Sequence, residues 1–341
     1  MSDVLRIYQD LFADYGKWRY YNKLNINPFL SIENSREFVS KFIELSGKAV
    51  GNPLFDNIIK LVDNRIKHIV STYFLGIYLY ENSDKIRFLA DKIVYRYKLK
   101  NPNSRIEFSF IWYLICLFHD LGYDIEDNQT FKSFDEFIDG RVKYYLKERV
   151  GVPPVFEKTY IDYFNYRLNS SNSNINKPDH GICGGILLFD ILNSNLIKKQ
   201  FQNSIYLSWN KKLINVYKFV SWVILSHNIH FIQKGDPSEK EYVDNNIQDL
   251  ILNNYDKPKI KLKTHTFLYL FQLVDSIDPI KLVVEYENLR DFELKCTNDI
   301  IEIKINNIEW QYEYIKRITG LKWWLNHHIK VDKNTITIPL K

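Results

Sequence analysis

Apolar residues recur at helical spacing through most of the chain up to about residue 280, and this periodicity constrains the fold more than any other feature. Side chains three or four positions apart share one helix face, so the repeat marks faces that pack on a core. The segment 107–121 is apolar on nearly all sides, as expected of a central buried helix. The pattern predicts helices over 36–46, 56–80, 83–97, 107–121, 133–149, 155–167, 181–193, 211–231 and 264–277.

The period changes after about residue 285. Apolar and polar residues alternate over 292–296 and 301–305, and again over 335–340, which is typical of half-exposed strands. A helical pattern at 308–327 separates the second and third of these segments. We therefore expect a mainly α protein with a small C-terminal α+β appendage of β-β-α-β order. The predicted domains are an N-terminal helical segment over 1–54, a helical domain over 55–283 and the appendage over 284–341.

Composition excludes several classes of protein. Lys and Arg number 46 against 41 Asp and Glu, and no long basic block occurs, so we expect no nucleic-acid partner. The apolar run Ile111–Phe118 is far shorter than the roughly 20 residues of a membrane-spanning helix. No secretory signal is visible, and the 3 scattered cysteines suggest buried free thiols. The expected location is the cytoplasm, without a membrane partner.

Histidine and aspartate interrupt the apolar pattern in five successive predicted helices. A single buried histidine is ordinary, because backbone or a neighbour can satisfy it. Repeated burial is costly unless a charged partner such as a divalent cation is present. The interrupting residues are His68, His119 with Asp120, His180, His227 and Asp275. This mixed nitrogen and oxygen set favours Mn, Fe, Co, Ni or Zn over Mg or Ca, and its size suggests two metal ions that share Asp120.

This order of residues, with His-Asp-Leu-Gly at 119–122, resembles the HD-domain superfamily of metal-dependent phosphohydrolases over roughly residues 55–280. The resemblance implies an HD-type helical bundle with a dinuclear metal site at its centre. It also implies that one metal takes His68, His119, Asp120 and Asp275. The other metal would take His180, His227 and the second oxygen of Asp120.

The expected function is hydrolysis of a phosphoester in a nucleotide or related small molecule. Two cations make hydroxide available near neutral pH and neutralise charge on the phosphoryl oxygens. We expect Asp120, as the bridging ligand, and Asp124 to take part in catalysis. One of Asp124, Glu126 and Asp127 would supply a general acid or a carboxylate that orients a ligand histidine. The candidate phosphate-binding residues are Arg65, Lys67 and Lys177.

Two alternatives stay open, together with a homo-oligomeric state. One is a dinuclear-iron oxygenase of the same superfamily, and the other is a non-catalytic module that senses a nucleotide. Tyr123 stands where the cyclic-dinucleotide phosphodiesterase branch has Lys, and no Gly-Tyr-Pro follows, which argues against that branch. The remaining histidines, His230, His265, His327 and His328, are expected to be structural.

Overall fold

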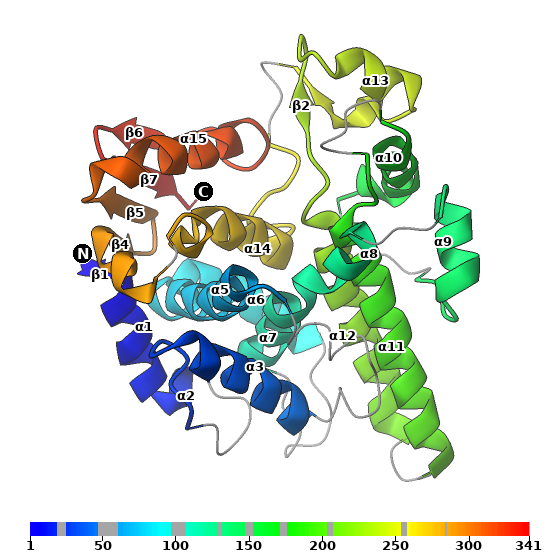
Figure 1. Ribbon diagram of the computed structural model, residues 1–341, viewed down its shortest axis with the longest axis horizontal. Coiled ribbons are helices and arrows are strands. Elements are labelled where there is room, and N and C mark those ends of the chain that lie inside the picture. The colour runs from blue at the N-terminus through cyan, green and yellow to red at the C-terminus, as the bar shows by residue number, and fades with distance from the viewer. Residues whose placement is uncertain are drawn as a thin grey trace. The chain divides into compact units, whose positions relative to one another are not determined.

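The computed structural model describes residues 1–18, 25–46, 61–96, 107–127, 131–146, 153–170, 176–202, 207–253, 258–283 and 285–340. Over these ranges the protein is mostly helical, with a small antiparallel sheet built largely from its C-terminal region (Figure 1). The chain separates into two compact units. Unit 1 comprises Met1–Arg96, Glu107–Leu117 and Pro258–Lys341, and unit 2 comprises Tyr97–Ile106 and Phe118–Lys257. Unit 2 is therefore an insertion in the chain of unit 1, and the three domains expected from the sequence stay a prediction.

Helix α5 (Asp63–Asn82) forms the centre of unit 1. It lies between α14 (Thr266–Ile277) on one side and the pair α1 (Val4–Ala13) and α3 (Ile32–Ser46) on the other (Figure 1). The almost wholly apolar α7 (Phe108–Phe118) runs along α5 within this unit. Further helices in the described part of unit 1 are α2 (Tyr15–Trp18), α6 (Asp84–Arg96) and α15 (Ile308–Trp324). Polar residues on α5 consequently lie in an apolar environment.

The sheet of unit 1 has five strands in the order β1-β4-β5-β7-β6, all antiparallel. Its alternating strands match the predicted ones: Leu294, Ile303 and Ile336 face inward along one line of the register. The bounds are β1 (Ser2–Asp3), β4 (Phe292–Cys296), β5 (Ile300–Ile305), β6 (Lys330–Asp332) and β7 (Thr335–Pro339). The predicted β-β-α-β order thus gains a short fourth strand, β6, and the N-terminal strand β1 at one edge.

Unit 2 is organised around two long helices, α11 (His180–Gln202) and α12 (Leu207–Ser226), which pack along each other. The 3-10 turn η1 (His119–Gly122) packs against α11. A methyl group on Gly122 would lie 2.0 Å from the carbonyl oxygen of His180, so only glycine permits this approach. The other elements that the structure describes in unit 2 are α8 (Tyr123–Asp127), α9 (Phe134–Arg141), α10 (Phe156–Asn169), β2 (Ile232–Gln233), α13 (Glu239–Asp244), η3 (Gln248–Leu250) and β3 (Ile251–Leu252).

Some predicted helix bounds differ from the observed ones. The helix predicted over 56–80 begins at Asp63, whose carboxylate suits the positive end of a helix dipole; residues 56–60 of that prediction lie outside the described part. The helix predicted over 133–149 ends at Arg141, directly after Gly140, a poor helix former. Conversely, the helix predicted over 181–193 extends to Gln202.

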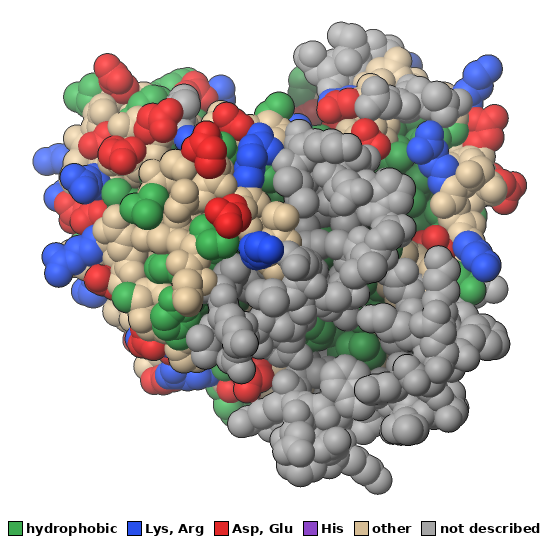
Figure 2. Space-filling view, turned by 60° about the horizontal axis from the view of Figure 1, so that its bottom comes forward, with side chains coloured by type: hydrophobic (Ala, Val, Ile, Leu, Met, Phe, Trp, Pro, Cys, Tyr) green, Lys and Arg blue, Asp and Glu red, His purple; other side chains and the backbone are tan. Residues whose placement is uncertain are grey.

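The described surface carries charges of both signs. On the face drawn in Figure 2, Lys and Arg side chains alternate with Asp and Glu side chains, and neither sign gathers into a patch on the described residues. Among the described helices, none combines the length and the apolar composition required of a membrane span.

Candidate metal centre

Unit 2 brings together four of the six predicted metal ligands. His119 and Asp120 open η1 at the end of the apolar α7, His180 begins α11, and His227 directly follows α12. All four side chains are buried. The ring centre of His227 lies 5.7 Å from that of His119 and 5.3 Å from that of His180. Each residue therefore sits at the polar end of an apolar helix, and the helix ends converge.

Two histidines of this set are fixed in one tautomer by an oxygen acceptor. His180 donates from Nδ1 to Oε2 of Glu126 over 2.7 Å, and His227 donates from Nδ1 to the carbonyl oxygen of Ile224 over 2.5 Å. A carbonyl or a carboxylate can only accept, so Nδ1 is the donor in both rings, and Nε2 carries the lone pair in the neutral form of each ring. This is the arrangement in which proteins present histidine to a metal.

Glu126, which orients His180, is itself held by cations. Its Oε1 lies 2.7 Å from Nζ of Lys177 and 3.8 Å from a guanidinium nitrogen of Arg167. Burial alone would raise the pKa of Glu126, but hydrogen bonds and charges from His180 and Lys177 lower it to about 2. Glu126 is thus an ionised, buried carboxylate, and the sequence offered it only as one of three candidates for this role.

Asp179 anchors the start of α11 and was not singled out from the sequence. Its side chain is fully buried, and its Oδ1 accepts from the backbone N–H of Ile182, capping the helix. Its Oδ2 accepts from Asn228 at 2.7 Å and lies 3.5 Å from Arg167. Because Asn228 directly follows His227, Asp179 ties the His180 and His227 segments together. No motif marks this role in the sequence.

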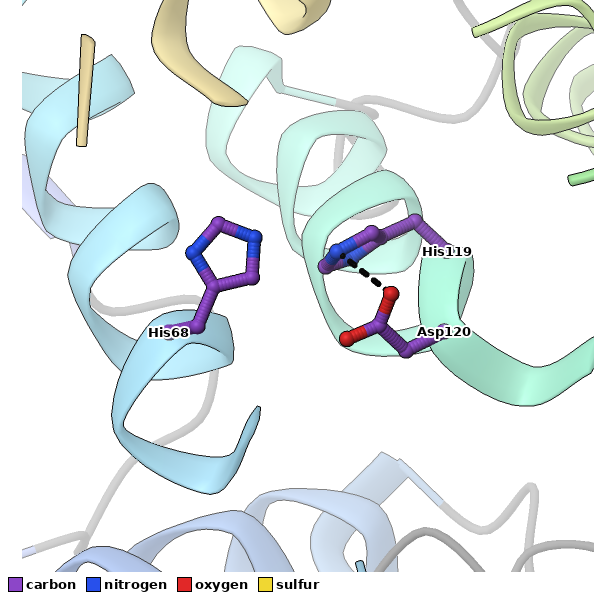
Figure 3. A group of neighbouring side chains, drawn as sticks. All are labelled: His68, His119 and Asp120. Carbon is purple, nitrogen blue, oxygen red and sulfur yellow. Dashed lines mark ion pairs between the residues drawn. The ribbon is translucent and has the colours of Figure 1, made fainter. Parts of the chain in front are cut away.

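Unit 1 holds the other two predicted ligands as a second set. His68 projects from the second turn of α5 (Figure 3) and is buried. It donates from Nδ1 to Oδ2 of Asp278 over 2.6 Å, and its Nε2 lies 3.0 Å from Oδ1 of Asp275. Asp278 is fully buried and also accepts from the hydroxyl of Ser71. The sequence places Asp278 on the same helix face as Asp275 but gave it no role.

The charges around His68 oppose one another. Burial and the positive charge of Lys281 lower the pKa of His68, whereas Asp275 and Asp278 raise it, and the net result is a raised pKa. Nζ of Lys281 lies 2.6 Å from Oδ1 of Asp275, the same oxygen that faces His68.

The donor spacing in both sets fits a metal ion. In unit 2, Nε2 of His119 and Oδ1 of Asp120 are 3.0 Å apart (dashed line in Figure 3); in unit 1, Nε2 of His68 and Oδ1 of Asp275 are also 3.0 Å apart. Two adjacent ligands that each lie ~2.1 Å from one octahedral ion are separated by about 3 Å. His68, His119 and Asp120 are all buried and have donor atoms of the type transition metals prefer.

The other predicted site residues lie in different surroundings. Asp124 is exposed on α8, and Arg65 is half-buried on α5. Lys67 is buried, with Nζ 3.4 Å from Glu285 and above the ring of Tyr286. Tyr123 stacks on the His180 ring at 4.0 Å.

The four histidines set aside from the sequence have other surroundings. His230 is exposed, His265 contacts Thr264, and the rings of His327 and His328 contact each other.

Comparison of the chain with protein-family models, with curated proteins and with solved structures finds no match.

Proposed function

We propose that the protein is a metal-dependent phosphohydrolase of the HD type, in which the two ligand sets hold two divalent transition-metal ions. One observation carries the proposal: His68, His180 and His227 each commit Nδ1 to an oxygen acceptor. Ordinary core histidines satisfy either ring nitrogen, whereas in all three of these it is Nδ1 that meets the acceptor; Nε2 of His68 faces a second carboxylate, that of Asp275. The carboxylates of Asp120 and Asp275 add the oxygen donors.

The packing of α5 and α7 in unit 1 gives His68 its apolar surroundings. The helices run antiparallel: Tyr80 stacks on Phe108, Gly76 faces Trp112, and Thr72 hydrogen-bonds Cys116. Each step of four residues down α5 matches four residues up α7. His68 lies one turn beyond Thr72, toward the start of α5, and thus directly follows this apolar contact within unit 1.

The chemistry divides between the cations and the protein. Bound there, the cations would lower the pKa of a water molecule and neutralise charge on a phosphoryl group. Glu126 and Asp278 keep His180 and His68 in the orientation that ligation requires. Asp124, exposed on the helix after His119 and Asp120, is the candidate acid for the leaving group. Lys177, beside His180 and partly exposed, is a candidate partner of the phosphate.

The first experiment is elemental analysis of the purified protein, followed by a phosphate-release screen across nucleotides with Mn, Ni, Fe and Mg. We expect bound transition metal and release of phosphate with at least one of the metals other than Mg. Bound iron with a mixed-valence signal and no phosphoester turnover would contradict the proposal and favour the oxygenase alternative.

Replacement of the shared ligand tests the site itself. Asp120→Ala is expected to abolish bound metal and activity together, while circular dichroism shows unchanged helix content. His230→Ala and His265→Ala serve as matched controls and should retain their metal. Retention of two metal ions by Asp120→Ala would show that the ligand assignment is wrong.

A further inference from the structure

In unit 1, a line of contacts leads from the core to solvent at the His68 set. Asp278 contacts His68, His68 contacts Asp275, and Asp275 contacts Lys281, over 2.6, 3.0 and 2.6 Å. The exposed fraction of the side chains rises along this line. It is 0% for Asp278, 7% for His68, 21% for Asp275 and 33% for Lys281. A molecule that approaches this ligand set from solvent therefore meets Lys281 first.

Lys281 and a metal ion would compete for one atom. Oδ1 of Asp275 faces both Nζ of Lys281 and Nε2 of His68, and it is the oxygen whose spacing from His68 fits a shared ion. A divalent cation at this oxygen repels the ammonium group. Asp275 is the only ion-pair partner that Lys281 has within the part of the chain that the structure describes. Lysine has a flexible stem, so its ammonium can turn from Asp275 toward another anion nearby.

The backbone of Lys281 is anchored although its side chain is not. Lys281 lies in the turn η4 (Pro279–Lys281), and Asp278 caps this turn by accepting from the N–H of Ile280. The same carboxylate accepts from His68. One buried residue thus fixes both the ligand histidine and the base of the lysine, so the ammonium group stays within a side chain's reach of His68.

We propose that Lys281 binds the phosphate group of the substrate, and that Asp275 holds its ammonium until a metal ion occupies the Asp275 carboxylate. This inference rests on the proposed function, since it requires a metal at Asp275. An ammonium group next to a divalent cation is a suitable phosphate-binding pair, because both charges attract the same oxygens. Lys281 was not among the three basic residues singled out from the sequence.

The test measures the binding of inorganic phosphate to the Mn-loaded protein by calorimetry, after the Mn affinity itself has been measured. Lys281→Gln is expected to weaken phosphate binding roughly 10- to 100-fold, because this is the effect of losing one hydrogen bond between charged groups. It should also bind Mn as tightly as the wild type or more tightly, because a competing cation is gone. Lys281→Arg should restore most of the phosphate affinity. Lys295→Gln is the matched control, because Lys295 pairs with Glu302 on the sheet and lies outside the ligand sets.

The outcomes separate the two proposals. Equal phosphate affinity in the wild type and Lys281→Gln, with Mn bound to both, would overturn the role of Lys281 and leave the phosphohydrolase proposal intact. Weaker Mn binding by Lys281→Gln would also overturn it, since Lys281 would then assist the metal ligand rather than compete for it. A wild-type protein that binds no transition metal would overturn both proposals.

Discussion

Asp278→Asn should weaken both the fold and the proposed metal site, by amounts that its contacts define. The carboxylate is fully buried and accepts from His68 Nδ1 and from the Ser71 hydroxyl, each over 2.6 Å. Hydrogen bonds to a charged group are worth about 1.5–3 kcal/mol and neutral ones about 0.5–1.5 kcal/mol. An amide keeps the contact with His68 through its oxygen, and its NH2 group can donate to Ser71, which then donates to Tyr8. The backbone N–H of Ile280 loses its acceptor, because it also donates to the oxygen that the NH2 group replaces.

The loss of charge on two bonds and the loss of the Ile280 bond therefore predict destabilisation by about 2–3 kcal/mol, less than the ~5–15 kcal/mol that holds a domain together. Alanine would instead cost about 3–5 kcal/mol, since it leaves all three donors, from His68, Ser71 and Ile280, without this acceptor. The asparagine variant is for this reason the one that still folds.

The same substitution should lower metal affinity 10- to 100-fold, because a neutral amide supports a ligand imidazole less well than a carboxylate. Denaturant unfolding of the metal-free protein measures the first effect, and competition with a chelator measures the second. Asp91→Asn is the control: its carboxylate accepts from Tyr80 but is exposed, so both quantities should hardly change. If Asp278→Asn binds metal as tightly as the wild type, Asp278 does not orient a metal ligand and the reasoning fails.

Two further predictions concern packing and buried thiols. Gly122→Ala should destabilise the protein by about 3 kcal/mol in denaturant unfolding, because the new methyl group meets the backbone of His180 and Gly184. Gly140→Ala is the control: its methyl group meets nothing within 4 Å, so it should stabilise the protein slightly. Equal effects of the two substitutions on the free energy of unfolding would refute the close approach of η1 and α11. Burial raises the pKa of the Cys116 and Cys183 thiols well above normal and that of Cys296 to about 12, so a thiol reagent at pH 8 should label none of the 3 cysteines until denaturant is added. Rapid labelling of the folded protein would contradict their burial.

Hydrophobic periodicity was enough to predict most helices and the main strands. Phe292, Leu294 and Cys296 alternate with polar residues, and all three are buried in β4. Strands β1 and β6 were missed because two or three residues cannot show an alternation. Ser2 and Asp3 also lack the residue types that favour strands.

Burial of the histidines was predictable for the same reason, since each follows or interrupts an apolar run. The carboxylates that accept hydrogen bonds from these histidines could not be predicted from the sequence. Glu126 lies 54 positions from His180, and Asp278 lies 210 positions from His68. Which of several acids meets a given imidazole depends on how helices pack, and no local pattern encodes that.

The insertion of unit 2 within unit 1 has a consequence for synthesis on the ribosome. The chain emerges from its N-terminus, and domains generally fold as units once they are complete. His119, Asp120, His180 and His227 all belong to the segment that ends at Lys257, whereas His68 must wait for Asp275 and Asp278. Strand β1 waits longer still, because Ser2 pairs with Leu294. Unit 2 can thus fold, and bring its proposed metal-ligand residues together, before the rest of the chain has been synthesised. The residues of β1 are the first to be synthesised but are among the last to form their native contacts.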